Sequence, residues 1–427
     1  MEKTLSSKLS ALFILLAVVF AAFSAQAQQQ LSGNVFAYKS EPFVAVVVDK
    51  STSILYIVEM KDDRPEIIAK TSVLVGGGGG DKKVSGDMKT PEGVYYITGF
   101  LSPEQLRKAY GSTADDYGTG AFPLSYPNFF DRISGKTGSG IWIHGKRVDR
   151  KEQTTRGCVA LENDVLDKYK QYLKRGVPVV IARKVNFEQL HNYESEKAFL
   201  KEKLDGLVAS WEGLDYDSFA SNYHIQFRSG SGENYAQYLR KKKVLMGLYP
   251  ERSIEISSVR AFKENGDEFL YDFNQLYCAD NLLAYGNKKL YLKKEVDELK
   301  IIAEEFFSES YEPVVRARVA EFLEEWKISW ESMDIGKYMA AYSSSFSSDG
   351  FSYESWKADK TDKFQKYSTI KINIDNIKIS QVSPKRVRVS FIQHFIGDSY
   401  SDTGIKTLEL EGCPGDYKIR SELWRAK

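Results

Sequence analysis

The sequence predicts a multidomain protein in which a mainly β domain is followed by two copies of an α+β domain. Short apolar segments separated by glycine and proline extend to about residue 184, and helical spacing of apolar residues begins only after residue 196. Beyond that point the sequence repeats itself with a period of roughly 115 residues. A chain of 427 residues is long enough for two to three such domains.

Residues 1–27 have the layout of a secretory signal peptide. A short basic start precedes an apolar run of about a dozen residues, and Ala25-Gln26-Ala27 follows in the pattern of a cleavage site. A membrane anchor is the alternative, but the run is shorter than the roughly 20 residues that span a bilayer. We therefore expect an exported protein with no integral membrane segment once the leader is cleaved.

Charge and cysteine content limit the possible partners and cofactors. The 59 basic and 58 acidic residues nearly balance, which gives no electrostatic reason to expect binding to nucleic acid. Three cysteines cannot all pair within one chain. We expect Cys278 and Cys413 to be buried thiols, with a disulfide between them as the less favoured alternative. Zinc would need three or four ligands, whereas the other histidines lie in other domains, and we expect neither a metal nor a cofactor.

The first domain is expected to span residues 42–184. One helix is predicted in "ENDVLDKYKQYLKRG", which ends at Gly176. The predicted strands lie in "PFVAVVVDKSTSILYIVEM" (two strands joined by a polar turn), "IIAKTSVLVG", "GVYYITGF", "SGIWIHG" and "VPVVIARK".

The two α+β copies are expected at residues 196–307 and 312–427. Each begins with an amphipathic helix and continues through a short helical segment into several strands. Trp211 and Trp330 lie on the apolar faces of the first helices, so we expect both in the core. The matches include Leu204 with Leu323, Trp211-Glu212 with Trp330-Glu331, Tyr223 with Tyr342, and "GNKKLYL" from Gly286 with "GIKTLEL" from Gly404.

The segment "IHGKRVDRKEQTTRGCVAL", residues 143–161, contains the candidate catalytic residues. His144 ends one apolar strand and Cys158 precedes another, so both side chains emerge at one end of the sheet if the strands are neighbours. A cysteine nucleophile needs a base and donors for an oxyanion. Gly157 allows close approach to the backbone, and the charge of Arg156 would lower the pKa of the thiol. The alternative is a buried free cysteine and an unrelated histidine.

The combination of "HG" with "[ST]-x-G-C" resembles the signature of the L,D-transpeptidase catalytic domain, the YkuD family. "VVVDKSTSILYIVE" and "KTPEGVYYITG" resemble two further segments of that family, in the same order. The resemblance implies that Cys158 is the nucleophile, that His144 transfers protons and that the Gly145 carbonyl orients the imidazole. Thr155, Arg156 and Gly157 would form the oxyanion or substrate-binding site.

The sequence departs from the family at two points. Ala160 stands where the family usually has arginine or asparagine, and the spacing between the histidine and the cysteine is slightly short. The first departure affects substrate anchoring rather than the nucleophile. Arg147, Arg150 or Arg156 are candidates to compensate.

Each C-terminal copy resembles the cone-shaped nuclear-transport-factor-2-like (NTF2-like, SnoaL-like) domains. Together with the first domain, the arrangement is similar to peptidoglycan-trimming L,D-carboxypeptidases that shape curved bacteria. The resemblance implies a periplasmic enzyme that acts on peptidoglycan tetrapeptide stems, as a transpeptidase or as a carboxypeptidase. A non-catalytic wall-binding or assembly protein is the alternative from another class.

Overall fold

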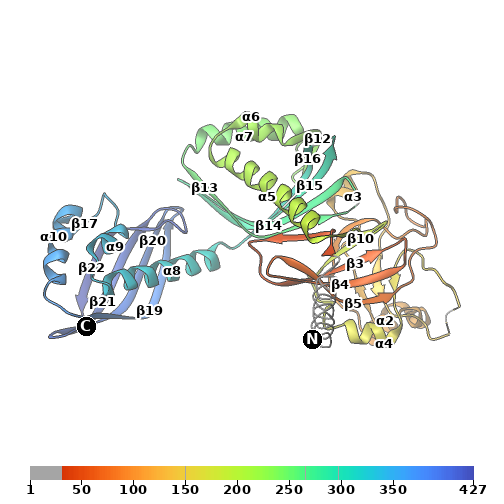
Figure 1. Ribbon diagram of the computed structural model, residues 1–427, viewed down its shortest axis with the longest axis horizontal. Helices are drawn as coiled ribbons and strands as arrows, with labels where there is room; N and C mark the ends of the chain where they lie inside the picture. The colour runs from red at the N-terminus through yellow and green to blue at the C-terminus, as the bar shows by residue number, and fades with distance from the viewer. Residues whose placement is uncertain (1–30, 150, 265, 297) are drawn as a thin grey trace, which may run out of the picture.

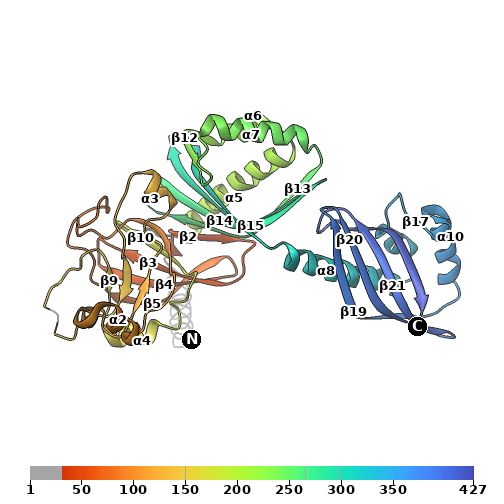
Figure 2. The ribbon, with the colours of Figure 1, turned by 180° about the vertical axis from the view of Figure 1, so that it is seen from behind.

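The computed structural model describes residues 31–149, 151–264, 266–296 and 298–427, so the predicted signal peptide lies outside the described residues. Figure 1 shows a β-rich first domain, a middle domain and a last domain, with α8 leading into the last one. Figure 2 shows the same order from behind. Within the described ranges, no helix is long and apolar enough to cross a membrane.

The first domain is built on a five-stranded sheet with the order β5-β4-β3-β10-β6, in which β3 and β10 are parallel. Both faces of this sheet are buried. Val46 and Val48 pack into the core of the domain, whereas Ala45 and Val47 pack toward the middle domain, which explains the unbroken apolar run of β3. The strands are β3 (Phe43–Asp49), β4 (Ile54–Lys61), β5 (Arg64–Ser72), β6 (Gly93–Tyr96) and β10 (Pro178–Ala182).

A second sheet of three short strands, in the order β7-β8-β9, lies beside the first. Helix α2 was not expected, although Ser102 and Gln105 form a capping box at its start. Helix α4 ends at Tyr169, earlier than predicted. The elements are β7 (Ala121–Pro123), β8 (Trp142–His144), β9 (Val159–Ala160), α2 (Pro103–Tyr110), the 3₁₀ helix η1 (Gly111–Tyr117), α3 (Phe129–Ile133) and α4 (Asn163–Tyr169).

The middle domain has a six-stranded sheet with the order β12-β16-β15-β14-β13-β2. Its edge strand β2 (Val35–Tyr38) precedes the first domain in the sequence and pairs antiparallel with β13. Nearby, β1 (Leu31–Ser32) pairs with β11 (Phe187–Glu188). The remaining elements are α5 (Leu190–Glu212), α6 (Tyr216–Ser221), α7 (Tyr235–Leu248), β12 (Tyr223–Ser229), β13 (Arg252–Lys263), β14 (Glu268–Ala279), β15 (Leu282–Glu295) and β16 (Glu298–Glu309).

The last domain repeats this plan with a four-stranded sheet in the order β19-β20-β21-β22. As expected, Trp211 and Trp330 are buried in the two cores. The elements are α8 (Glu312–Glu331), α9 (Ile335–Ala340), α10 (Tyr353–Phe364), β17 (Ser347–Ser348), β18 (Phe351–Ser352), β19 (Ile370–Ser383), β20 (Arg386–Gly397), β21 (Ser401–Glu411) and β22 (Lys418–Ala426).

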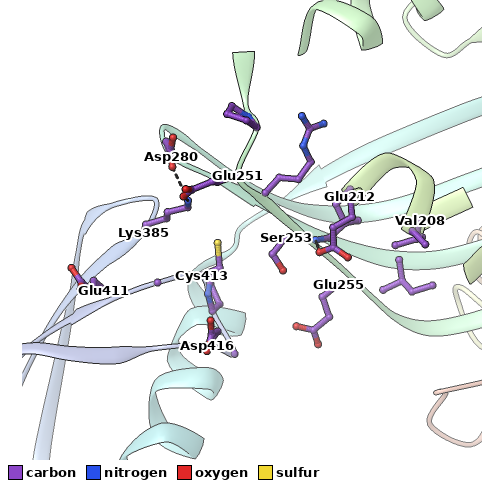
Figure 3. Close-up of a pocket in the computed structure, with 18 of the residues that line it drawn as sticks. Val208, Glu212, Glu251, Ser253, Glu255, Asp280, Lys385, Glu411, Cys413 and Asp416 are labelled. Carbon is purple, nitrogen blue, oxygen red and sulfur yellow. Dashed lines mark hydrogen bonds and ion pairs between the residues drawn. The ribbon is translucent and has the colours of Figure 1, made fainter. Parts of the chain in front are cut away.

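A disulfide joins Cys278, at the end of β14, to Cys413, just after β21, with the two Cα atoms 5.9 Å apart. The expectation of two buried thiols was therefore wrong. The residues are 135 positions apart, and only the docking of the two domains brings their sheet ends together. Lys385 reaches across the same junction to Asp280, with 2.6 Å between Nζ and Oδ1 (Figure 3).

Candidate active site

His144 is the last residue of strand β8, and Cys158 comes directly before the neighbouring parallel strand β9. Strand β8 pairs with β9 so that Ile143 faces Val159 and His144 faces Ala160. Ile143 and Val159 point into the core, and because side chains alternate along a strand, His144 and Ala160 share the opposite face. The two strands are therefore neighbours, but the expectation that both side chains emerge at one end of the sheet was wrong: because the strands are parallel, Cys158 lies two positions before the level of His144.

The Cys158 thiol is partly exposed, and it is the only cysteine outside the disulfide. Its Sγ donates to the carbonyl oxygen of Gly140 at 3.3 Å. The loop before it is held by Thr155, whose hydroxyl donates to the Cys158 carbonyl at 2.7 Å and accepts from the Gly157 N–H at 3.1 Å. Thr155 therefore fixes the backbone around the thiol, and the Gly157 amide is already engaged within the loop.

Gly157 is required by the geometry of this loop. Its φ of +124° suits glycine, and a Cβ here would lie 2.7 Å from the carbonyl oxygen of Lys89. The loop that carries Lys89 is joined to the Cys158 loop by a bridge between Gly76 and Thr155. The residues that the sequence assigned to substrate or oxyanion binding thus form a tight loop directly before the thiol, packed against the segment around Lys89.

The His144 imidazole is 4% exposed, and its Nδ1 contacts the carbonyl oxygen of Gly145. A carbonyl oxygen can only accept, so Nδ1 carries the hydrogen and the neutral ring has its lone pair on Nε2. This is the contact that the resemblance assigned to Gly145. It sets the tautomer in which Nε2 can take a proton from a thiol.

Asn163, which the sequence did not single out, holds the backbone on both sides of this contact. Its Oδ1 accepts from the N–H groups of Thr119 and Lys146 at 3.2 and 3.1 Å, and its Nδ2 donates to the Lys146 carbonyl at 2.9 Å. A Cβ on Gly145 or Gly118 would lie 2.2 or 1.9 Å from this Oδ1. Gly118 and Gly145 were the only hint of this contact in the sequence, because both positions lack a Cβ. The sequence does not show that the Asn163 side chain lies against them.

Tyr117 is a second residue that the sequence did not indicate. Its ring lies edge-on to the His144 ring, with the centroids 5.1 Å apart, and packs against Trp142 at 4.9 Å. Burial raises the pKa of the Tyr117 phenol, and interaction with Cys158 raises it further. An aromatic wall therefore borders the imidazole and the thiol.

The three candidate arginines have different surroundings. Arg147 pairs with Asp116, with 3.3 Å between Nε and Oδ1. Arg156 is exposed and its charge lowers the pKa of Tyr117, the same phenol that interacts with Cys158. Arg150 lies outside the described residues. Ala160 is buried beside His144, so its position provides no polar group to a substrate.

Comparison with known families agrees with this architecture. The model of the L,D-transpeptidase catalytic domain (YkuD) matches residues 44–181. The model of the Cds6 C-terminal NTF2-like domain matches twice, at residues 199–305 and 318–423. The double match has the same order and spacing as the internal repeat.

Three known proteins are similar to parts of the chain. The "Putative L,D-transpeptidase YafK" of Escherichia coli (strain K12) is 28% identical over 150 residues, which are 35% of this chain and 52% of that protein. The chain thus spans about half the length of this curated relative. Bd1075 of Bdellovibrio bacteriovorus is 29% identical, with a TM-score of 0.59, over 66% of this chain and 99% of that chain.

The helical cell shape determining protein Pgp2 of Campylobacter jejuni is 26% identical, with a TM-score of 0.54, over 64% of this chain and 95% of that chain. Both structural relatives thus align along nearly their whole length with only about two thirds of this chain. The family matches fall one in each of the three domains of the structure. The chain has a YkuD-type L,D-transpeptidase catalytic domain followed by two C-terminal NTF2-like domains.

Proposed function

We propose that the protein is an exported L,D-transpeptidase-family enzyme that acts on peptidoglycan tetrapeptide stems through a thioester at Cys158. The observation that carries this proposal is the placement of His144 at the end of β8 and of Cys158 directly before the adjacent parallel strand β9, with His144 Nδ1 held by the Gly145 carbonyl. A buried, oriented imidazole beside a partly exposed thiol suits nucleophilic catalysis.

In the proposed reaction, His144 Nε2 takes the thiol proton and the Cys158 sulfur attacks the carbonyl carbon of the third stem residue at its L-centre. The new C–S bond forms as the C–N bond to terminal D-alanine breaks. The imidazolium returns the proton to the leaving amine. An acceptor amine or water then attacks the thioester, giving transpeptidation or carboxypeptidation.

The hydrogen bond from the Cys158 thiol to the Gly140 carbonyl has to break in the proposed reaction. The thiol gives up this 3.3 Å hydrogen bond when its proton passes to His144. Arg156 places a positive charge near the site, which favours the thiolate once the proton has moved. We assign Arg156 the substrate-anchoring role that Ala160 leaves vacant. The Gly157 amide donates to Thr155, so loop rearrangement would be needed for it to hold an oxyanion.

The deciding experiment incubates the purified protein with a disaccharide tetrapeptide and determines the product masses. Cross-linked dimers identify the transpeptidase and tripeptide identifies the carboxypeptidase. Unchanged substrate would contradict both activities and favour a wall-binding or assembly protein. Arg156→Ala, compared with Arg147→Ala as its matched control, should raise the KM for the tetrapeptide, because Arg147 is already paired with Asp116. Equal effects of the two variants would contradict the role given to Arg156.

A further inference from the structure

The middle and last domains have matching edge strands. In the middle domain, Arg260 of β13 pairs with Asp272 of β14. In the last domain, Lys378 of β19 pairs with Ser390 of β20, and each of these residues lies 118 positions after its counterpart. The two sheets therefore have the same register, and the surroundings of their edges can be compared position by position.

The outer edge of β13 is covered by strand β2, which pairs antiparallel with residues 259–262. Phe36 and Tyr38 of β2 lie in the buried core of the middle domain, next to Val259 and Ala261 of β13. Val259 is 0% exposed and Ala261 is 2% exposed. This edge is thus closed by a strand that directs large apolar side chains into the core at alternate positions.

The corresponding edge of β19 is open. Residues 377–380 are the counterparts of residues 259–262, and no strand in the described part of the chain pairs with them on their outer side (Figure 2). Ile377 is 40% exposed where Val259 is fully buried, and Ile379 is only partly buried against the core of the last domain. The unpaired backbone N–H and C=O groups of such an edge are a template for an added strand.

Two features of β19 are of the kind that protects edge strands from pairing, a bulge and an exposed lysine. The bulge lies between Asp375 and Lys378, with Asn376 at a φ of +56°. However, β13 has a bulge at the same place, with Ser258 at a φ of +52°, and a basic residue, Arg260, at the same position as the lysine. Strand β13 nevertheless pairs with β2, so neither feature prevents a strand from binding here.

The charge on this edge indicates what the added strand carries. In the middle domain the Arg260 guanidinium pairs with the Asp272 carboxylate, with 2.7 Å between Nη2 and Oδ2. In the last domain Ser390 stands at the position of this aspartate, and Lys378 is exposed and makes no ion pair with any residue that the structure describes. An acidic residue at the position that Ala37 occupies opposite Arg260 would supply the missing charge.

We propose that the outer edge of β19 binds an extended segment of another protein as an added antiparallel strand. This segment has an acidic residue between two large apolar residues. Its apolar side chains pack on Ile377 and Ile379 at the inner face, as the apolar residues of β2 do in the middle domain. Its acidic side chain pairs with Lys378 on the outer face. The inference does not depend on the proposed reaction, which takes place in another domain.

The test uses synthetic peptides, because the edge of β13 is already filled by β2 of the same chain. One labelled peptide copies residues 33–39, and a second has the same sequence with Ala37→Glu. Fluorescence anisotropy measures their binding to the full chain at low salt. The glutamate peptide should bind saturably and about 1.5- to 5-fold more tightly than the alanine peptide, which is the gain expected from one cross-strand ion pair.

Two variants and one local measurement locate the site. Lys378→Glu should reverse the preference for the glutamate peptide, because like charges then face each other across the pair. Lys371→Glu is the matched control, since this exposed lysine is also on β19 but lies outside residues 377–380, and it should leave the preference intact. The bound peptide should slow hydrogen exchange of the amides of residues 376–380 and not of β22, which forms the opposite edge of the sheet.

The proposal is overturned if the glutamate peptide does not bind saturably, if exchange is slowed elsewhere and not on β19, or if the two lysine variants act alike. Sedimentation equilibrium distinguishes another protein from a second copy of this chain as the occupant of the edge. A monomer is the expected result. Self-association that Lys378→Glu abolishes would show that the edge pairs with its own copy and would overturn the assignment to another protein.

Discussion

The disulfide between Cys278 and Cys413 should stabilise the last domain by tethering it to the middle domain. When the last domain unfolds, the tether still holds Cys413 against the folded middle domain, so residues 310–413 become a closed loop. For a loop of about 100 residues, the chain-entropy model gives about 5 kcal/mol at 25 °C. Measured values for single disulfides are commonly about 2–4 kcal/mol. We therefore expect the Cys278→Ser/Cys413→Ser variant to lose about 2–5 kcal/mol of last-domain stability.

Urea unfolding, followed by tryptophan fluorescence, measures this loss because Trp326, Trp330 and Trp356 lie in or against the core of the last domain. The oxidised wild type should unfold at a higher urea concentration than the same protein in reducing agent. The double-serine variant should match the reduced protein and should not respond to reductant. It should also retain full catalytic activity, because Cys158 is unchanged. A stability difference below about 0.5 kcal/mol, far under the typical contribution of a disulfide, would refute the reasoning.

Three further changes have defined outcomes. Cys158→Ser should lower turnover of the tetrapeptide at least about 1000-fold with an unchanged circular dichroism spectrum, and residual activity above that level would contradict the nucleophile. Asn163→Ala should lower kcat about 10- to 100-fold and displace the pH profile, because it frees the backbone that orients His144; a change in KM alone would indicate a different role. Lys242→Met should stabilise the middle domain by about 1–3 kcal/mol, since burial and then Lys288 lower the pKa of Lys242 to about 7. In the unfolded chain the pKa of Lys242 is 10.5. The gain in the free energy of unfolding from Lys242→Met should therefore be full below pH 7 and shrink as the pH rises toward 10.5. Denaturation at pH 6 and at pH 9 tests whether the gain is larger at the lower pH.

The sequence predicted the parts of the fold that are local or periodic. Alternating and continuous apolar runs located the strands of the first domain, and helical spacing located α5 and α8. The repeat was visible because Trp211-Glu212 recurs as Trp330-Glu331, and each glutamate accepts from a strand amide, that of Ile254 in one copy and Ile372 in the other. Because both copies make the same contact between helix and strand, the same Trp-Glu pair recurs in the sequence.

Features that depend on long-range docking were not predicted. Strand β2 has only four residues, and its partner β13 lies more than 200 positions further along the chain. No periodicity of the sequence connects them. The same holds for Asn163, whose three hydrogen bonds reach Thr119 and Lys146 through space that two glycines leave open.

Strand β2 also shows why the catalytic and middle domains form one unit. Strand β2 belongs to the sheet of the middle domain, the chain next forms the catalytic domain, and α5 then begins the rest of the middle domain. Between the two sheets, Tyr96 donates to Asp272, which also pairs with Arg260 at 2.7 Å, and Asp272 is 1% exposed. If the two domains separated, the Asp272 carboxylate would lose the hydrogen bond from the Tyr96 hydroxyl.

Separation would also uncover an apolar surface. Ala45, Val47 and Val58 of the catalytic sheet form one core with Phe262 and Leu270 of the middle domain. An exposed face of this kind is a site of aggregation or binding rather than a free surface. The last domain is connected differently, through a short linker, the disulfide and ion pairs that include Lys385–Asp280 and Arg318–Glu255. The middle domain therefore completes the catalytic domain, whereas the last domain is a tethered addition.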